Sequence, residues 1–161
     1  MNTITVGMGD LRISTDPESV LVTYALGSCI AVMVHDRVRR VGGMIHYMLP
    51  LSSVTPERSL ERPAMFADTG IPMLFDHMYA QACRRSDLVV RVAGGASIQD
   101  ENGFFEIGKR NYLALRKLIW KAGLPITSEA VGGRVSRTVR LFVGSGRTTL
   151  RQSDMQQEVE L

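Results

Sequence analysis

Apolar residues in the first half of the chain gather in short runs with the pattern of β-strands. Segments 3–7, 19–25, 29–36 and 41–49 are rich in β-branched residues and are separated by polar or glycine-containing turns. We predict a strand in each, with segment 8–18 as a connection and Pro50 as the end of the fourth strand. Residues 50–70 contain three prolines among polar residues and predict a long surface loop.

From Ile71 onward, the spacing of apolar residues is that of a helix and no longer that of strands. One face of a helix is predicted by the spacing of Ile71, Leu74, Phe75, Met78, Tyr79 and Ala82. Segment 87–95 then predicts a strand that ends in a glycine pair. A second helix over 109–122 places on one face Tyr112, Leu115, Ile119 and Ala122. Gly123 and Pro125 end this helix, and residues 126–150 predict two or three further strands.

Strands at both ends of the chain with two main helices between them predict an α/β (α+β) fold, a layered sandwich built on mixed β-sheet. We expect one domain over residues 1–150, since 161 residues suit a single hydrophobic core. The tail, residues 151–161, is polar and predicted to be disordered.

Composition narrows the class of protein. Hydrophobic residues make up 45% and charged residues 22%, as in globular proteins, and no apolar run reaches the length of a membrane span. The N-terminus has no signal-peptide pattern, so we expect a cytoplasmic protein without membrane insertion. Cys29 and Cys83 are expected to be free thiols. No C-x-x-C or H-x-x-x-H pair occurs, and no metal site is predicted.

The net charge of +3 includes arginine clusters at 37–40, 84–85 and 134–140. These clusters are either a solvated surface or a match for an acidic partner protein. Aromatic residues make up only 6%, and no nucleic-acid-binding motif occurs, so nucleic acid is not an expected partner.

A hairpin of segments 29–36 and 41–49 brings candidate chemistry together. If the turn is centred between residues 37 and 38, Cys29 lies directly opposite His46 on one face of the sheet. A neighbouring imidazolium would lower the thiol pKa and later protonate a leaving group. Backbone N–H groups of Gly27, Ser28 and Cys29 would face a developing oxyanion. The alternative is that Cys29 is a buried packing residue, and the residues alone leave both open.

The stretch TYALGSCIAVMVHD, followed by GGMIHYMLP, resembles the signature of the CheD family of chemoreceptor glutamine deamidases. The similarity continues through VRVAGGAS, IGKRNYLALRKLIWKAGLPI and EAVGGRVSRTVRLFVGSG. It implies a catalytic triad of Cys29, His46 and Thr23, the threonine lying six residues before the cysteine. It also implies a fold similar to the deamidase domain of cytotoxic necrotizing factor toxins.

The resemblance further implies an enzyme that converts glutamines of methyl-accepting chemotaxis receptors to glutamate, with no cofactor and with CheC as a possible partner. Gly94 and Gly95 would let a substrate helix approach, or would only end a strand. Gln156 and Gln157 faintly resemble a receptor modification site, or belong to a plain tail. Two other functions stay open: an amidase or peptidase with another substrate, and a non-catalytic docking module for receptors or CheC.

Overall fold

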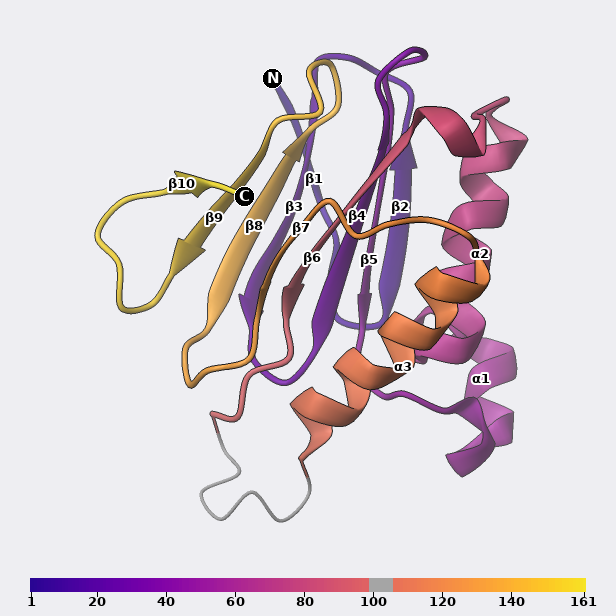
Figure 1. Cartoon of the computed structure of the whole chain (residues 1–161), viewed down its shortest axis with the longest axis vertical. Helices are drawn as coiled ribbons and strands as arrows, with labels where there is room; N and C mark the ends of the chain where they lie inside the picture. Colours follow the sequence, from indigo (N-terminus) through magenta and orange to yellow (C-terminus); the bar gives the residue numbers. More distant parts are fainter. Residues whose placement is uncertain (99–105) are drawn as a thin grey trace.

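Two five-stranded sheets stack face to face in the computed structural model, which describes residues 1–98 and 106–161 (Figure 1). Sheet A contains, in spatial order, β1 (Asn2–Thr5), β3 (Ser19–Leu26), β8 (Arg137–Phe142), β9 (Thr148–Gln152) and β10 (Val159–Glu160). Sheet B contains β2 (Asp10–Ser14), β5 (Val41–Tyr47), β4 (Ile30–Asp36), β6 (Leu88–Gly94) and β7 (Ser128–Val131). The β1–β3 and β6–β7 pairs are parallel and the other pairs antiparallel, so both sheets are mixed.

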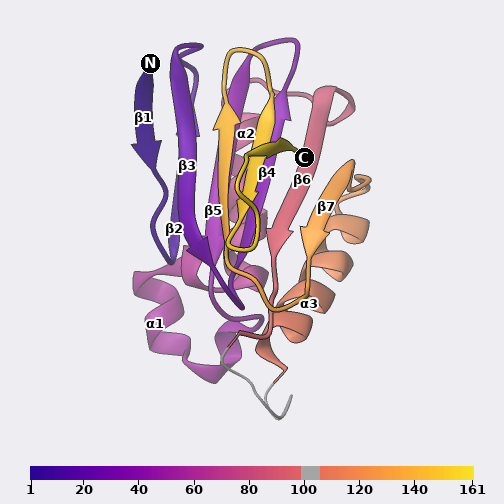
Figure 2. The same ribbon diagram turned by 90° about the vertical axis from the view of Figure 1, so that its left-hand side faces the viewer.

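Helices α2 (Ala67–Ala80) and α3 (Ile107–Lys121) form a third layer on the outer face of sheet B, and the short α1 (Pro56–Glu61) lies beside them (Figures 1 and 2). Every residue of β4 and β5 is buried, because sheet B is covered on both faces. One core cluster lies between sheet B and the helices, and the other between the two sheets. Each fully buried large apolar side chain contributes roughly 1.5–3 kcal/mol to stability.

The predicted α+β class, the mixed sheets and the main strands are confirmed. The helix predicted over 109–122 is α3, and the segment 126–150 contains β7, β8 and the start of β9. The hairpin of β4 and β5 has two apolar faces: Val32 and Ile45 pack toward the helices, whereas Met33 and Met44 pack between the sheets.

Two predicted irregular segments are regular in the structure. The connection over 8–18 contains β2, a short edge strand whose Leu11 and Ile13 pack against the helix-side core. The predicted loop over 50–70 contains α1, two 3₁₀ turns and the start of α2. Pro56 and Pro63 do not mark a loop, since each begins a helical turn. The first residues of a helix have no acceptor for their N–H groups, so proline fits there without loss of a hydrogen bond.

The predicted buried face of the first helix is also partly wrong. Ile71, Leu74 and Met78 are buried on α2, but Tyr79 is 39% exposed. Ala82 lies beyond the end of α2 with a φ of 64°, so it continues the turn and not the helix face.

The C-terminal tail is not disordered, contrary to the prediction. Arg151 and Gln152 belong to β9, and β10 folds back to pair with β9 in antiparallel register. An ion pair of 2.6 Å joins Arg147 to Glu160, and a second joins Arg140 to Glu158. The open edge of β9 provides main-chain partners that the polar composition of the tail does not reveal.

The β4–β5 register differs from the predicted one by two residues. Ala31, not Cys29, lies opposite His46, because the turn occupies residues 37–40 and is centred one position later. The Asp36 carboxylate fixes this turn by accepting hydrogen bonds from the N–H groups of Val38 (2.8 Å) and Arg39 (2.9 Å). Since side chains alternate between faces with a period of two, the shift leaves Cys29 and His46 on the same face.

Candidate active site

Thr23 and His46 meet across the two sheets. Thr23 extends from β3 of sheet A, and its Oγ1 lies 2.8 Å from Nδ1 of His46 on β5 of sheet B. Both side chains are buried between the sheets, with His46 only 2% exposed. The structure therefore brings together two of the three residues predicted for the triad in hydrogen-bond contact.

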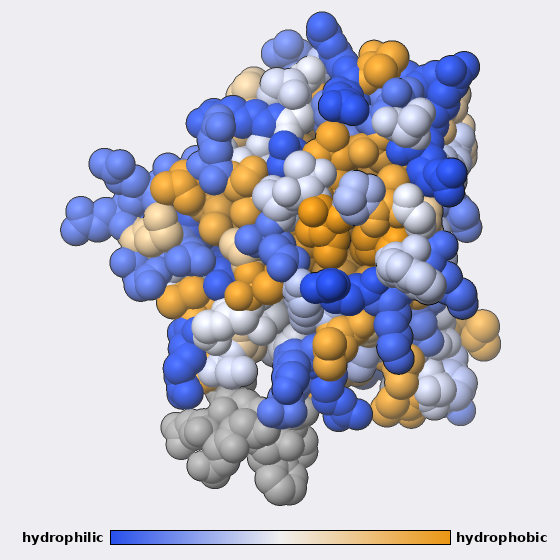
Figure 3. Space-filling view, in the orientation of Figure 1, coloured by the Kyte–Doolittle hydropathy of each residue, from blue (hydrophilic) through white to orange (hydrophobic). Residues whose placement is uncertain are grey.

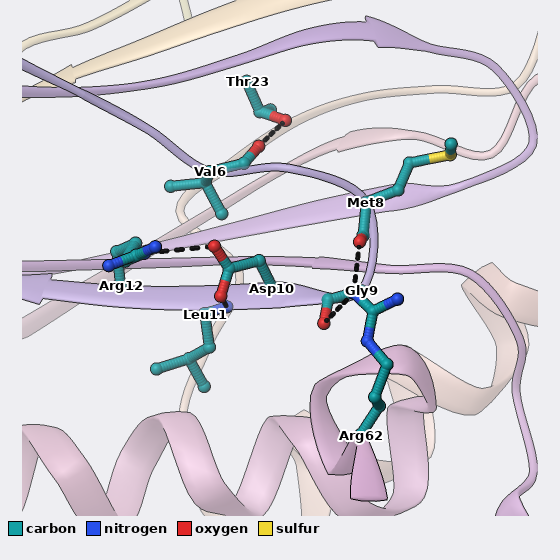
Figure 4. Close-up of polar contacts among 8 residues, drawn as sticks. All are labelled: Val6, Met8, Gly9, Asp10, Leu11, Arg12, Thr23 and Arg62. Carbon is teal, nitrogen blue, oxygen red and sulfur yellow. Dashed lines mark hydrogen bonds and ion pairs between the residues drawn. The ribbon is translucent and has the colours of Figure 1, made fainter. Parts of the chain in front are cut away.

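The Thr23 hydroxyl determines the tautomer of His46. Its single proton is donated to the main-chain oxygen of Val6 at 2.7 Å, because a carbonyl can only accept (Figure 4). The same hydroxyl must then accept from His46, which places the ring proton on Nδ1. Nε2 therefore carries the free lone pair, and it has no hydrogen-bond partner within residues 1–98 and 106–161. A buried imidazole with this free nitrogen is equipped to act as a base.

Cys29 lies directly before β4, on the same inter-sheet side as His46. Its half-buried side chain packs against the core between the sheets. It is diagonal to His46, a position from which long side chains still reach one another. Cys29 also lines a cavity of about 470 Å³ together with the predicted Gly27 and Ser28. The wall of this cavity is completed by Met8, Ala25, Ala96, Ser97, Ile98, Ile107 and Gly108.

Burial keeps both reactive groups neutral at rest. Desolvation lowers the pKa of His46 to about 4 and raises the pKa of the Cys29 thiol above its ordinary value. The expected imidazolium that stabilises a thiolate is thus not the resting form. A neutral thiol and a neutral imidazole suit a reaction in which the proton moves from sulfur to Nε2 as the thiol attacks.

The end of β6 holds the active-site turn from behind. The Ala96 N–H donates to the oxygen of Gly27, and the Gly95 N–H donates to the oxygen of Cys29, each at 2.9 Å. Gly94 has a φ of 116°, and a Cβ at this residue would lie 2.2 Å from the Cys29 oxygen. Gly94 and Gly95 therefore allow close approach of the chain's own backbone, and neither lines the cavity. Their predicted contact with substrate stays a prediction.

The segment between β1 and β2 wraps around His46. Val6 accepts the Thr23 proton, the Gly9 N–H donates to the His46 main-chain oxygen at 2.7 Å, and Met8 reaches the cavity. Arg62 anchors this segment, since its guanidinium donates to the main-chain oxygens of Met8 (2.9 Å) and Gly9 (3.3 Å) (Figure 4). These partners were not predicted from the sequence, because most of them are main-chain atoms.

Asn111 on α3 is a second missed residue. It is fully buried, and its Nδ2 donates to the main-chain oxygens of Ser28 (3.0 Å) and Met48 (2.9 Å). Its position is readable in the sequence, because it precedes the buried Leu115 and Ile119 by four and eight residues. A polar residue on an otherwise apolar helix stripe is the signal that would have found it.

The remaining cysteine and histidines lie outside the site. Cys83 is buried, and desolvation together with a hydrogen bond to the Asp36 carboxylate raises the pKa of its thiol to about 12. His35 is buried, and its Nε2–H donates to the oxygen of Val143 at 2.7 Å. His77 is exposed on α2. None of these three residues lines the Cys29 cavity.

Other features of the described ranges offer no competing chemistry. Residues 1–98 and 106–161 contain no group of three or more histidine, cysteine or acidic side chains that could hold a metal ion. They also contain no helix long and apolar enough to cross a bilayer. A groove of about 640 Å³ lies where α3 meets the segment leading to β7 and includes Trp120, Leu124 and Ile126, in the area where Figure 3 shows apolar side chains gathered. No thiol or imidazole lines it.

Comparisons with known proteins agree with the family resemblance of the sequence. A family model described as CheD chemotactic sensory transduction matches residues 48–152. A probable chemoreceptor glutamine deamidase CheD of Solibacter usitatus is 52% identical over 99% of this chain and 94% of the relative. A probable chemoreceptor glutamine deamidase CheD 2 of Anaeromyxobacter dehalogenans is 51% identical, covering 96% of this chain and 97% of the relative.

Among solved structures, the hypothetical protein YfiH of Bacillus licheniformis is similar with a TM-score of 0.47 and 15% identity. The match covers 75% of this chain and 49% of that protein.

Proposed function

Because the chain belongs to the CheD family, we propose that it is a chemoreceptor glutamine deamidase that uses Cys29 as nucleophile, His46 as base and Thr23 as the group that orients the base. The observation that carries this proposal is the Thr23–His46 hydrogen bond, which leaves the buried Nε2 unpartnered on the side of the sheet that bears Cys29. A base without a partner on the same inter-sheet side as a half-buried thiol suits acyl transfer through a thioester.

The reaction begins as Cys29 Sγ bonds to the side-chain carboxamide carbon of a substrate glutamine while the thiol proton moves to Nε2 of His46. The carbonyl oxygen takes up negative charge, which the N–H groups of Ser28 and Cys29 stabilise. The carbon–nitrogen bond then breaks, and Nε2 returns its proton to the departing ammonia. Water, deprotonated by His46, cleaves the thioester, which yields glutamate and restores the thiol. Every proton in this cycle is held by Cys29, His46, water or the leaving group, so no cofactor is needed.

The substrate follows from the family. The named relatives are chemoreceptor deamidases, so the glutamines belong to methyl-accepting chemotaxis receptors. We place the reaction in the cytoplasm, where the signalling helices of such receptors lie. The cavity rim is apolar, with Met8 59% and Ile98 40% exposed, which suits a helical segment that presents small side chains around its glutamine. Binding of CheC, which the resemblance implies, stays a prediction, as does a role for Gln156 and Gln157.

Incubation of the protein with a cytoplasmic receptor fragment tests the proposal. The wild type is expected to release ammonia and to convert receptor glutamine to glutamate, as read by mass spectrometry of receptor peptides. Cys29→Ala is expected to abolish both signals without unfolding the domain. Cys83→Ala is the matched control, because it removes the other thiol far from the cavity, and it is expected to retain the activity.

Two outcomes contradict the proposal. Cleavage of the receptor backbone by the wild type would indicate a peptidase with the same machinery. An unchanged effect of Cys29→Ala on receptor signalling in cells, with no ammonia release from the wild type, would indicate a non-catalytic docking module.

A further inference from the structure

Asn111 occupies a position in the helix layer where an apolar side chain would be expected. It lies on the face of α3 that carries Leu115 and Ile119, and its side chain is completely buried. Burying an amide costs free energy unless its donors and acceptors find partners. Its presence on this face therefore requires an explanation in terms of the contacts that it makes.

Those contacts join the two segments that carry the reactive groups. One Nδ2 hydrogen goes to the oxygen of Ser28, the residue before Cys29, and the other to the oxygen of Met48, two residues after His46. Tyr47 contacts only the backbone of α3 at this residue, since its hydroxyl donates to the main-chain oxygen of Asn111 at 2.7 Å and not to the side-chain amide. A single amide on α3 thus ties the nucleophile turn to the strand of the base.

The bond to Ser28 has a consequence for Cys29. The Ser28 carbonyl and the Cys29 N–H belong to one planar peptide unit, and they point in opposite directions when the peptide is trans. No cis peptide bond occurs in the described ranges. Because Asn111 fixes the carbonyl, it also fixes the direction of the Cys29 N–H. This N–H lies toward its own Sγ, where it lowers the thiol pKa against the effect of burial.

The side-chain oxygen of Asn111 indicates that this residue does not serve stability alone. Its Oδ1 is buried and has no hydrogen-bond partner in the part of the chain that the structure describes. A buried acceptor without a partner lowers the stability of the folded protein. A leucine would fill a similar volume without that cost, so the two donors of Nδ2 are the feature that distinguishes asparagine here.

We propose that Asn111 is a positioning residue for the deamidation reaction. Its side-chain amide holds the peptide unit between Ser28 and Cys29 so that the Cys29 N–H faces the oxyanion that forms beside Sγ. Its hydrogen bond to Met48 also fixes the position of this peptide unit relative to His46. The inference rests on the proposed function, since an oxyanion forms only if Cys29 attacks a carbonyl group.

Asn111→Leu removes the unpartnered oxygen but leaves the oxygens of Ser28 and Met48 without a donor, so the variant is expected to fold with a somewhat lower unfolding temperature. We expect kcat for receptor deamidation to fall about 10- to 100-fold, somewhat less than direct loss of an oxyanion donor, with KM within about threefold of the wild type. Asn111→Asp retains the size of the side chain but places an oxygen where Nδ2 donates to the two carbonyls. If the leucine variant does not fold, we expect the same fall in kcat from this aspartate variant.

Tyr47→Phe is the matched control. It removes the hydrogen bond to the Asn111 main chain but leaves both Nδ2 contacts, so it is expected to lower stability while kcat stays within about twofold of the wild type. A second readout is the pH profile of Cys29 alkylation by iodoacetamide. Asn111→Leu is expected to move this profile to higher pH, because the N–H no longer stabilises the thiolate, whereas Tyr47→Phe leaves it in place.

The outcomes separate this inference from the proposed function. If the wild type deamidates receptors and a folded Asn111→Leu variant retains its kcat and its alkylation profile, the positioning role is wrong and the proposed function stands. If the wild type releases no ammonia, the proposed function is wrong, and the alkylation profile still shows whether Asn111 orients the Cys29 N–H.

Discussion

The hydroxyl of Thr23 selects the nitrogen of His46 that is free to accept a proton. A threonine that donated to the imidazole would leave the proton on Nε2 and block the base. The main-chain oxygen of Val6 prevents this, because it takes the only proton of the hydroxyl. The proposed triad therefore depends on a fourth group that no side-chain motif records, the carbonyl of the first residue after β1.

Thr23→Val tests this role at almost constant volume. We expect kcat for deamidation to fall about 100-fold or more, because His46 loses the partner that fixes its tautomer and orientation. Stability should fall by about 1–3 kcal/mol, since the Val6 oxygen and His46 Nδ1 are left unpaired. Kinetics with a receptor fragment and urea unfolding measure the two effects.

Thr149→Val is the control for that substitution. Thr149 is 1% exposed on β9, and its Oγ1 has no partner among the described residues, so valine should cost little stability and leave kcat unchanged. Equal kcat values for Thr23→Val and the wild type would show that the Thr23–His46 bond does not serve catalysis.

At the scale of elements, the end of β6 supports the site, because it packs behind the turn that precedes β4. Gly94 allows this approach, and Gly95 and Ala96 supply the N–H groups that hold the Cys29 and Gly27 oxygens. The active-site turn is therefore fixed by a strand some 65 residues away in the sequence. Its geometry cannot be inferred from the residues LGSC alone.

Gly94→Ala is expected to displace this turn. Its Cβ would overlap the Cys29 oxygen, and alanine is strained at a φ of 116°, so we expect a loss of roughly 2–4 kcal/mol in stability and a large fall in kcat. Thermal unfolding and deamidation kinetics measure these effects.

Gly132→Ala is the matched control. Gly132 also has a positive φ, of 81°, but no atom of the described residues lies within 4 Å of the position that a Cβ would take there. Only the backbone strain of about 1–2 kcal/mol therefore applies. Its kcat should remain near that of the wild type. If both alanine variants lose activity equally, close packing against Cys29 is not the reason for glycine at position 94.

Sequence reasoning succeeded where local patterns decide the structure. The apolar runs of β3, β4 and β6 and the stripe of α3 predicted these elements, and a motif named Thr23 and His46, which the structure brings into hydrogen-bond contact. The catalytic role of Cys29, named from the same motif, stays a prediction. The β4–β5 register was predicted two residues out, because side-chain capping by Asp36 sets the turn. The tail strand β10 and the contacts of Asn111 were missed because they depend on partners distant in the chain.

At the scale of the whole molecule, each of the three layers contributes to the site. Thr23 comes from sheet A, Cys29 and His46 from sheet B, and Asn111 from the helix layer. The inter-sheet layer also holds a second buried imidazole, His35, which extends from β4 to Val143 after β8. Both histidines thus connect the two sheets, and burial lowers the pKa of each.

Acid should therefore weaken the packing of the two sheets. The pKa of His46 is about 4 in the folded protein and 6.5 ordinarily, so between these values the unfolded chain binds a proton that the folded protein excludes. Its contribution is fully present above pH 6.5 and is lost as the pH falls toward 4, a change of roughly 3 kcal/mol. His35 acts in the same direction, because its pKa is also lowered.

Urea unfolding at pH 7 and pH 4.5 measures this effect. In His46→Gln the loss of stability between the two pH values should be about 2–3 kcal/mol smaller than in the wild type, because the substituted side chain does not titrate. His77→Gln, which changes an exposed imidazole on α2, should retain the wild-type difference. An identical difference in all three proteins would mean that burial does not lower the pKa of His46, and the expected loss of stability through this residue in acid would be wrong.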